Sequence, residues 1–392
     1  MFAFTYLQGL KLPNFKTPNT GAICDYMFLV SFAYDYTGKK INGLNFTGSD
    51  FSNVISAKGM FMGYNLALPS DKLSDASINL GNNEFSNAAD VSWMFAFTSV
   101  NLDLTNVKMK NIQNADYMFA FYGISPFSRY QAIVKEEEED IFAYYASIKM
   151  PASTTTPAFT FAEGASTNYM FLLTLAGDPA KFKEGKTATP QTLDLGFMDT
   201  QNVTSMTGMF MLSAPSFELA KLNTKKVTST KLMFAGYGFI PILNLVTGDS
   251  SIGMDSLPKL NFPASASTGN FKLIGNCDTR YMFSCFIEYP GIDDTKKEFK
   301  NFDLSGIDVS QLTNFKLMFA FGLGVCNFDL SSWDITKAKN LDMMFLGYGL
   351  LARLDAADNL FFDCPASGRM LKLPTALPSA PTTSSESYCS AS

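Results

Sequence analysis

The chain of 392 residues contains no histidine. This absence removes the Ser-His-Asp triad, the Cys-His pair and every histidine-based zinc site. We therefore expect no catalytic, cofactor-binding or metal-ligating residues, and the sequence favours a protein that is not an enzyme. An enzyme on a repeat scaffold would need carboxylates clustered in a groove, and the sequence offers only scattered ones such as Asp293-Asp294.

The cysteines show no CxxC spacing, which argues against a zinc ribbon. An even number of cysteines permits disulfides without requiring them. Buried free thiols are the other interpretation, and the sequence leaves both open. The six cysteines are Cys24, Cys277, Cys285, Cys326, Cys364 and Cys389.

Long apolar runs are missing as well, since no stretch approaches the roughly 18 uninterrupted apolar residues of a membrane span. We expect no membrane insertion. The first residues, MFAFTYLQGL, have no basic start and no small-residue cleavage site, so no signal peptide is predicted. Charged residues are only 17% of the chain and the net charge is −6, which argues against nucleic acid or an anionic membrane as a partner.

The chain is rich in phenylalanine, and the dipeptide Met-Phe occurs eleven times. Upstream of ten of these pairs lies an apolar-x-apolar triplet such as Leu102-Asp103-Leu104, and in seven cases it begins sixteen residues before the methionine. The gap from Met-Phe to the next triplet varies from eight residues to about thirty. A block of fixed length alternating with a variable one is typical of a solenoid, where insertions collect along one edge.

The residues of each block predict one coil. The triplet has period two and predicts a short strand. After a polar turn, apolar residues recur at helical spacing, as in Val203, Met206 and Met209, which predicts a short helix or 3-10 turn ending in Met-Phe. The expected fold is a right-handed leucine-rich-repeat-like or β-solenoid stack of about eleven coils.

Met-Phe falls at the same place in every coil, which predicts an internal ladder of phenyl rings with thioethers packed against them. We interpret this ladder as hydrophobic core and not as a ligand site. Its predicted members are Met27, Phe28, Met60, Phe61, Met94, Phe95, Met118, Phe119, Met170, Phe171, Met209, Phe210, Met233, Phe234, Met282, Phe283, Met318, Phe319, Met344 and Phe345.

The repeat predicts a single solenoid domain over residues 1–373, with insertions near 124–147 and 240–258. The first insertion contains the acidic run from Lys135 to Asp140, which we interpret as a solvated loop or short acidic helix. Binding of Ca²⁺ or of a basic partner is the other interpretation of this run. Residues 374–392 are rich in Pro, Ser and Thr, a composition typical of a linker or stalk.

The run from Leu193 to Phe210, LDLGFMDTQNVTSMTGMF, resembles the 26-residue repeat of bacterial surface proteins, the BspA-like family. The stretches 302–319 and 328–345 match that repeat nearly as well, and the other coils keep only the triplet and Met-Phe. The resemblance implies a leucine-rich-repeat-like solenoid on secreted or surface-anchored proteins that act in adhesion and protein binding. It implies no catalytic residues.

Two sets of polar residues have both a functional and a local explanation. The middle residue of the triplet is Asp103, Asp194, Glu218, Asp303 or Asp329 in five coils, which stacking would align on one face. Such a ladder could bind a cation or a partner, or the carboxylates could simply accept hydrogen bonds from nearby turn N–H groups. Asn45 and Asn202 begin glycosylation sequons, which have meaning only in a glycosylating host.

The two ends of the sequence complement each other. Met1-Phe2 begins in the middle of a coil, whereas Leu371 and Leu373 begin a new coil of the type that reaches Met-Phe after twenty-two residues. That count from Leu371 ends at position 393, where the Met-Phe of another copy would fit. We expect either a segment of a longer array or head-to-tail association. A disulfide between Cys24 and Cys389 across the junction is one interpretation of these two residues, and two unrelated cysteines are the other.

The sequence thus predicts a non-enzymatic, extracellular or cell-surface structural or adhesive protein. Its expected partner is itself, or a host or cell-surface protein. The alternative is a monomeric surface receptor or ligand-binding module that uses the insertion edge.

Overall fold

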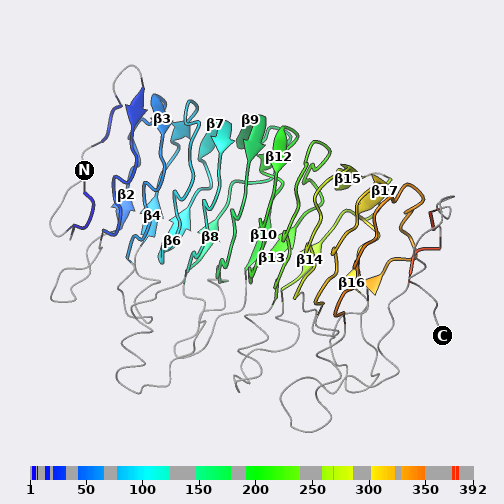
Figure 1. Ribbon diagram of the computed structural model, residues 1–392. Helices are drawn as coiled ribbons and strands as arrows, with labels where there is room; N and C mark the ends of the chain where they lie inside the picture. Colours follow the sequence, from blue (N-terminus) through cyan, green and yellow to red (C-terminus); the bar gives the residue numbers. More distant parts are fainter. Residues whose placement is uncertain are drawn as a thin grey trace, which may run out of the picture.

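The computed structural model describes residues 2–5, 7, 14–17, 21–31, 43–65, 77–123, 146–177, 191–238, 258–267, 269–285, 302–322, 328–348, 373–375 and 377–378. Figure 1 shows these residues as one elongated body in which short strands follow one another in chain order. Within these ranges there is no helix, and every strand pairing is parallel. The strands form several sheets, none of them closed. The fold is therefore β-rich and repeat-like.

A first row of strands is formed by the apolar-x-apolar triplets, and Figure 1 shows it along the lower side of the body. Its register keeps equivalent residues together, because Ile78 pairs with Leu44 on one side and with Leu102 on the other. Inward side chains therefore stack on inward side chains from strand to strand. The row comprises β2 (Leu44–Asn45), β4 (Ser77–Asn79), β6 (Asn101–Asp103), β8 (Ile148–Lys149), β10 (Thr192–Asp194), β13 (Ser216–Glu218), β14 (Leu260–Asn261), β16 (Phe302–Asp303) and β18 (Phe328–Asp329).

A second row of strands precedes the Met-Phe pairs and lies along the upper side in Figure 1. One sheet of this row runs from β5 through β7 and β9 to β11, and β12 also pairs with β9. The row comprises β1 (Ala22–Ile23), β3 (Val54–Ser56), β5 (Glu84–Phe85), β7 (Lys108–Asn114), β9 (Phe159–Ser166), β11 (Met198–Asp199), β12 (Val203–Ser205), β15 (Lys272–Gly275) and β17 (Asp308–Leu312).

The prediction of one strand and one short helix per coil was wrong in its second half. Val203, which began the expected helix, lies in strand β12, and the Met-Phe pairs lie in non-helical turns. The apolar spacing was real, since Val203, Met206 and Met209 are all buried. A strand followed by a tight corner brings such residues to one side just as a helix does, so the periodicity alone could not separate the two structures.

Along each Met-Phe turn, backbone N–H groups donate alternately to the next turn and to their own turn. The N–H groups of Phe95 and Phe97 donate to the carbonyls of Met118 and Ala120 in the next turn, at 2.9 Å each. The N–H groups of Met94 and Ala96 donate three residues back, to Val91 and Trp93, at 3.2 and 3.1 Å. Each turn is thereby closed on itself and bonded to its neighbour, as an interior segment with buried polar groups requires. We call the stretch from four residues before a Met-Phe pair to four residues after it a rung.

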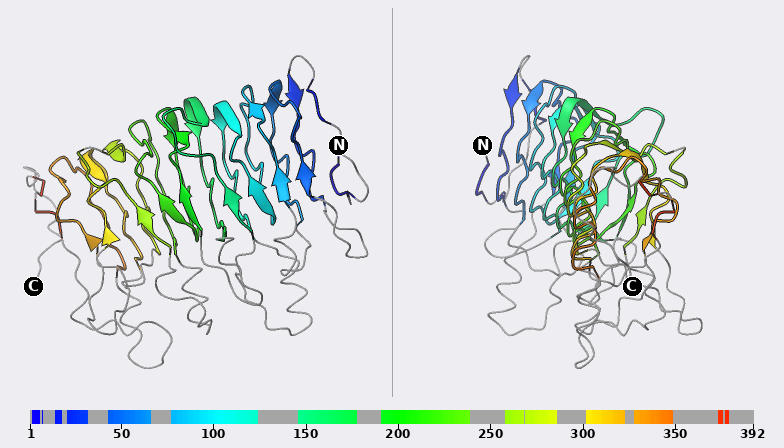
Figure 2. Two further views of the ribbon diagram at one scale, coloured as in Figure 1. Left: turned by 180° about the vertical axis from the view of Figure 1, so that it is seen from behind. Right: turned by 45° about the vertical axis from the view of Figure 1, so that its right-hand side comes forward.

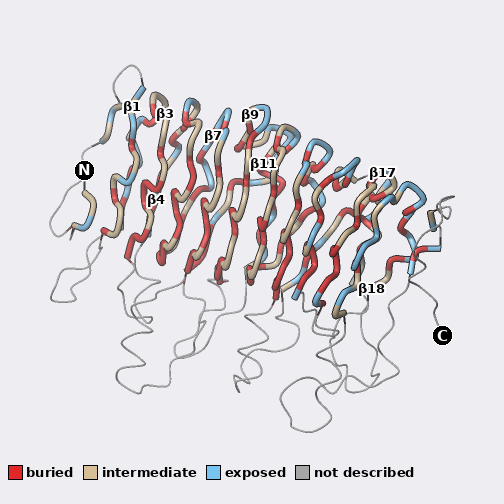
Figure 3. The backbone as a smooth tube through the Cα atoms, in the orientation of Figure 1, coloured by how far each residue is buried: buried red, intermediate tan, exposed pale blue. Residues whose placement is uncertain are grey.

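The core fills the space between the two rows and the Met-Phe turns. Buried residues run along the inward side of successive rungs, as the red segments of Figure 3 show. The left panel of Figure 2 shows the same row of strands from behind, with no break in the stack of described rungs. The insertions predicted near 124–147 and 240–258, with the acidic run from Lys135 to Asp140, fall almost entirely outside the described residues, as does nearly all of 374–392.

Candidate interaction surfaces

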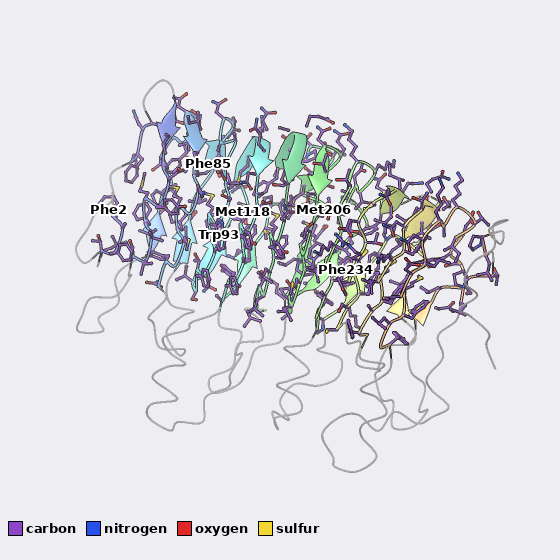
Figure 4. All side chains as sticks on the ribbon, in the orientation of Figure 1. Phe2, Phe85, Trp93, Met118, Met206 and Phe234 are labelled. Carbon is purple, nitrogen blue, oxygen red and sulfur yellow. The ribbon has the colours of Figure 1, made fainter. Side chains whose placement is uncertain are left out.

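The phenyl rings of the eleven Met-Phe pairs form one continuous stack through the core. Successive rings from Phe2 to Phe345 lie 5.1–5.8 Å apart between centroids, with their planes within 18° of parallel. Phe2 and Phe234, labelled in Figure 4, are two members of it. The partner methionines from Met60 to Met318 are fully buried, and only Met27, Phe2 and Phe345 are partly exposed. The stack leaves no room for a ligand and is structural.

Hydroxyl groups tie several rungs to the rung before them. The Thr98 hydroxyl donates to the Phe61 carbonyl at 2.8 Å, and the Thr174 hydroxyl donates to the Phe119 carbonyl at 2.8 Å. At the same position of another rung stands Tyr122, whose buried hydroxyl lies within hydrogen-bonding distance of two backbone carbonyls. Polar groups inside the core are thus used to fix the spacing of the rungs.

The middle residues of the triplets lie on one outer flank, which we call the polar flank. The Asp194 carboxylate accepts the N–H of Gly196 at 2.8 Å, and Asp103 accepts the N–H of Thr105 at 3.1 Å. Asn45 and Asn79 make the same turn through their amide oxygens. These side chains therefore close the local turn, and the same geometry serves for Asp and Asn.

Neighbouring side chains further occupy the polar flank. Lys149 lies 3.7 Å from the Asp103 carboxylate, and Glu218 accepts a hydrogen bond from the Asn261 amide. Burial opposes the charge of Asp103, but the Thr105 hydrogen bonds and Lys149 outweigh it and lower its pKa. No group of three or more Cys, Asp or Glu side chains in the described ranges is placed to hold a metal ion.

A second flank, formed by the outer side of the Met-Phe turns, is apolar. Its members are the residue before each Met-Phe pair and the two residues after it, such as Tyr26, Leu29 and Val30 around Met27-Phe28. Small members such as Ala96 and Ala120 are buried beneath their larger neighbours. We call this set, from Tyr26 to Gly347, the outer strip. Across its ten rungs it contains no charged residue and no Asn or Gln, and its only hydroxyls are those of tyrosines and Ser284. The two flanks thus differ completely in polarity.

The outer strip is built on strained backbone. Eighteen non-glycine residues in the described ranges have positive φ, and sixteen of them stand immediately before a Met-Phe pair or two residues after it. Examples are Trp93 at 58°, Phe97 at 55° and Val30 at 47°. This conformation costs an ordinary residue roughly 1–2 kcal/mol and is favoured by Gly, Asn and Asp. Large apolar residues, which occupy these positions, are among the residue types least compatible with positive φ.

Side chains of the outer strip pack against the equivalent positions of the next rung along the rod. Trp93 stacks on Tyr117 at 4.2 Å, Tyr117 stacks on Tyr169 at 5.0 Å, and Phe97 stacks on Phe121 at 4.5 Å. Tyr26 and Tyr169 have no ring to stack on in the next rung, and there the next rung has glycine. A Cβ atom on Gly59 would lie 2.5 Å from the Tyr26 ring, and one on Gly208 would lie 2.2 Å from the Tyr169 ring. The sequence showed the aromatic residues beside Met-Phe but not their outward direction, which depends on the positive φ.

The last described rung is open on its outer side. In the rung before it, the N–H groups of Phe319 and Phe321 donate to the carbonyls of Met344 and Leu346. The equivalent N–H groups of Phe345 and Gly347, and those of Leu341 and Met343, have no acceptor among the described residues. Leu341, Met343 and Leu346 are 38%, 61% and 43% exposed, and the Phe345 ring is only partly buried.

Of the predicted junction residues, the structure describes three. Phe2 lies at one end of the phenyl stack, where its ring stacks on Phe28. Leu373 is exposed at the other end of the body. Cys24 is buried and carries a free thiol, whose pKa burial and the nearby Asp25 raise. Met1, Leu371 and Cys389 lie outside the described residues, so the proposed pairing of Cys24 with Cys389 stays a prediction.

The two sequon asparagines differ in accessibility. Asn45 is exposed, and its amide oxygen accepts the Thr47 N–H at 2.9 Å. Asn202 is half-buried, with its amide nitrogen donating to the Phe161 carbonyl at 3.2 Å and its oxygen accepting a hydrogen bond from Lys226 at 3.0 Å. A glycan on the Asn202 amide nitrogen would have to be accommodated next to the Phe161 carbonyl, whereas Asn45 is exposed.

Comparison with known protein families gives a match over part of the chain. The family described as "Mycoplasma protein of unknown function, DUF285" matches residues 182–239 and 290–352, less than half of the chain. These stretches contain the three repeats on which the resemblance to the bacterial surface protein repeat was based, but that repeat family was not itself found. No curated protein and no solved structure matches the chain. Within the described ranges no segment forms a helix that could cross a membrane.

Proposed function

We propose that the chain is a non-enzymatic structural repeat protein, a right-handed β-solenoid that acts outside the cell or at its surface by associating head to tail with further copies. The extracellular location is supported by the resemblance of residues 193–210 to bacterial surface repeats. The absence of an enzymatic role is supported by the polar flank, where carboxylates such as Asp194 close turns instead of converging on a site.

One observation carries the proposal, namely the open face of the last described rung. Four backbone N–H groups, those of Leu341, Met343, Phe345 and Gly347, have no acceptor among the residues that the structure describes, although their equivalents in earlier rungs bond to the following rung. At the opposite end the Phe2 ring is only partly buried and Phe4 is 71% exposed. Unpaired strand-like edges and open apolar ends favour addition of another copy that continues the same pattern.

The geometry defines how the second copy would add. Within the chain, a Phe N–H donates to the Met carbonyl of the next rung at 2.7–3.0 Å, and the phenyl rings stack at 5.1–5.8 Å. A rung of a second copy laid on Phe345 would receive the same bonds and place its own phenylalanine on the Phe345 ring. Such an interface is heterologous and does not close on itself, so it generates rods of unlimited length.

Negative-stain microscopy combined with sedimentation velocity tests this proposal. The purified chain is expected to form rods that lengthen with protein concentration. The variant Leu341→Lys/Phe345→Lys places two charges on the open face and is expected to give single particles. The matched control Ile274→Lys alters an equally exposed apolar residue away from the ends and should leave the rods intact. Single particles from the unaltered chain, or rods from the end variant, would refute head-to-tail addition.

A further inference from the structure

The apolar residues of the outer strip occupy a backbone conformation that is unfavourable for them. Asn or Gly at the positions of Trp93, Phe97, Tyr117 and Phe121 would relieve the positive-φ strain, and the chain uses Asn at Asn65 and Asn111, which have positive φ outside the strip. Stacking between rings returns part of this energy, about 0.5–1.5 kcal/mol per pair. It does not do so for Tyr26, Leu212 or Phe321, each of which covers only a glycine of the next rung.

Two features of the outer strip restrict what can bind to it. Its aromatic rings stack face to face, with planes within 16° of parallel, so they present their edges. Sugars that stack on aromatic residues need free ring faces, which leaves a glycan poorly accommodated. Its backbone N–H groups are already bonded within and between rungs, so an added peptide strand has no partners in the interior of the strip. A long, flat, uncharged partner surface fits best.

The charged residues beside the strip do not favour a lipid surface. The position before the strip holds Lys58, Lys231, Arg280 and Lys316, but also Asp25, Asp116 and Asp342. Arg280 is moreover paired with Asp278 at 2.8 Å, and the Asp25 carboxylate accepts hydrogen bonds from Ser56 and the Lys58 N–H. A membrane-binding strip would need an excess of unpaired basic residues along its border.

A second outer strip has the required length, flatness and lack of charge. Ten rungs at a strand spacing of ~4.8 Å give a length of about 45 Å. Surfaces that pair with themselves are also the common form of protein association.

We propose that the outer strip is a lateral pairing surface, through which two copies of this chain associate side by side about a two-fold axis. The polar flank of each copy then faces solvent, and the apolar flank is covered. This pairing uses the side of the rod and is independent of its ends. It joins two rods, whereas head-to-tail addition lengthens one.

The test uses the end variant Leu341→Lys/Phe345→Lys as its background, so that head-to-tail addition cannot contribute to the measured mass. Sedimentation equilibrium is expected to give twice the mass of one chain. Adding Trp93→Asn, Phe97→Asn, Tyr117→Asn and Phe121→Asn is expected to halve that mass. Asn tolerates positive φ, so the melting curve followed by circular dichroism should shift little. The matched control Asp103→Asn/Lys149→Asn on the polar flank should keep the double mass.

Either of two results would overturn lateral pairing. One is a single-chain mass for the end variant at its highest soluble concentration. The other is a double mass that survives the four Asn substitutions while the melting curve is unchanged. If the four substitutions instead unfold the chain, Leu173→Cys in a Cys285→Ser background decides the matter. Leu173 lies near the middle of the strip, so mild oxidation should link two chains there, and a product that remains a single chain contradicts the two-fold arrangement.

A monomeric end variant that pellets with phosphatidylcholine vesicles, and no longer does so after the four substitutions, would identify the strip as a lipid surface and would also overturn the proposal. If lateral pairing fails while the unaltered chain still forms rods, only the side-by-side association is lost. If pairing persists while the unaltered chain forms no rods, only head-to-tail addition is lost.

Discussion

At the scale of single residues, the outer strip depends on which positions are glycine. Gly208 has φ of 58° and lies under the Tyr169 ring, whereas Gly275 has nearly the same φ, 57°, and nothing within 4 Å of its Cβ position. The two positions therefore separate backbone strain from contact with a neighbouring side chain. The structure assigns the first effect to both glycines and the second to Gly208 alone.

We predict that Gly275→Ala lowers the free energy of unfolding by roughly 1 kcal/mol and that Gly208→Ala lowers it by 2 kcal/mol or more, because an alanine methyl there displaces the Tyr169 ring. Urea denaturation measures both changes. In the double variant Tyr169→Ala/Gly208→Ala the clash is absent, so its loss should be smaller than the sum of the single losses. Additive losses would show that the ring does not lie over Gly208.

Cysteine reactivity provides a second test at this scale. Cys285 is exposed at the outer strip, whereas Cys24 and Cys277 are buried. Burial raises the pKa of Cys277 to about 11, so at pH 8 its reactive thiolate is rare. We predict that iodoacetamide alkylates Cys285 well before either of the other two in the native chain, as read from peptide masses. Equal rates in the native chain, together with equal rates in urea, would contradict the described burial.

At the scale of structural elements, the sequence predicted the triplet strands and the buried Met-Phe column but not the shape of the connecting turn. Leu102-Asp103-Leu104 has the alternation of a half-buried strand, and β6 forms there. The spacing of Val203, Met206 and Met209 suits a helix face and a strand-plus-corner equally well. The choice between the two is made by hydrogen bonds between rungs, such as that from the Phe210 N–H to the Met233 carbonyl. The local sequence does not encode these bonds.

The outer strip escaped prediction for a related reason. A tyrosine or tryptophan before Met-Phe, as at Trp93 or Tyr117, reads as one more core aromatic residue. Its direction is set by φ, and a sequence in which such residues replace Gly or Asn gives no local sign of a left-handed backbone. The polar flank was easier, because Asp and Asn two residues before a turn N–H form a known local motif.

Strand β17 supplies a pH prediction at this scale. The Asp308 carboxylate on β17 forms an ion pair with Lys272 on β15 at 2.9 Å. It also accepts hydrogen bonds from the backbone N–H and the hydroxyl of Ser310. Burial opposes the charge of this carboxylate, but these partners outweigh it and hold its pKa below the usual range. Hydrogen bonds likewise lower the pKa values of Asp278 and Glu84.

The unfolded chain therefore binds protons to these carboxyls at higher pH than the folded chain does. Their stabilisation is complete above the unfolded pKa, about 4, and is lost as the pH falls through the folded values. We predict that urea-unfolding free energy declines between about pH 5 and pH 2. Asp308→Asn should reduce both the stability at pH 7 and the size of this decline. A variant with the same decline as the unaltered chain would exclude Asp308 as a contributor.

At the scale of the whole molecule, one repeated unit produces three different surfaces. The middle residue of the triplet presents a polar side chain outward, and the residues beside Met-Phe present apolar ones. The last described rung has backbone donors with no acceptor in the described part of the chain. Repetition extends the polar and the apolar surface along the rod, so each of these two surfaces is elongated. A protein organised in this way is suited to contacts with other extended surfaces, which both proposed modes of association use.

The central claim is that successive rungs lie in register along the rod, although long segments of chain separate some of them. Disulfide trapping tests it most directly, because Ser205 pairs with Ser229 and Ser229 pairs with Asp278 across adjacent rungs. In a Cys285→Ser background, Ser205→Cys/Ser229→Cys should form an intramolecular disulfide under mild oxidation, and so should Ser229→Cys/Asp278→Cys. Ser205→Cys/Asp278→Cys spans two rung spacings, about 10 Å, and should stay reduced. A disulfide in this last variant, or none in the first two, would contradict the stacked arrangement.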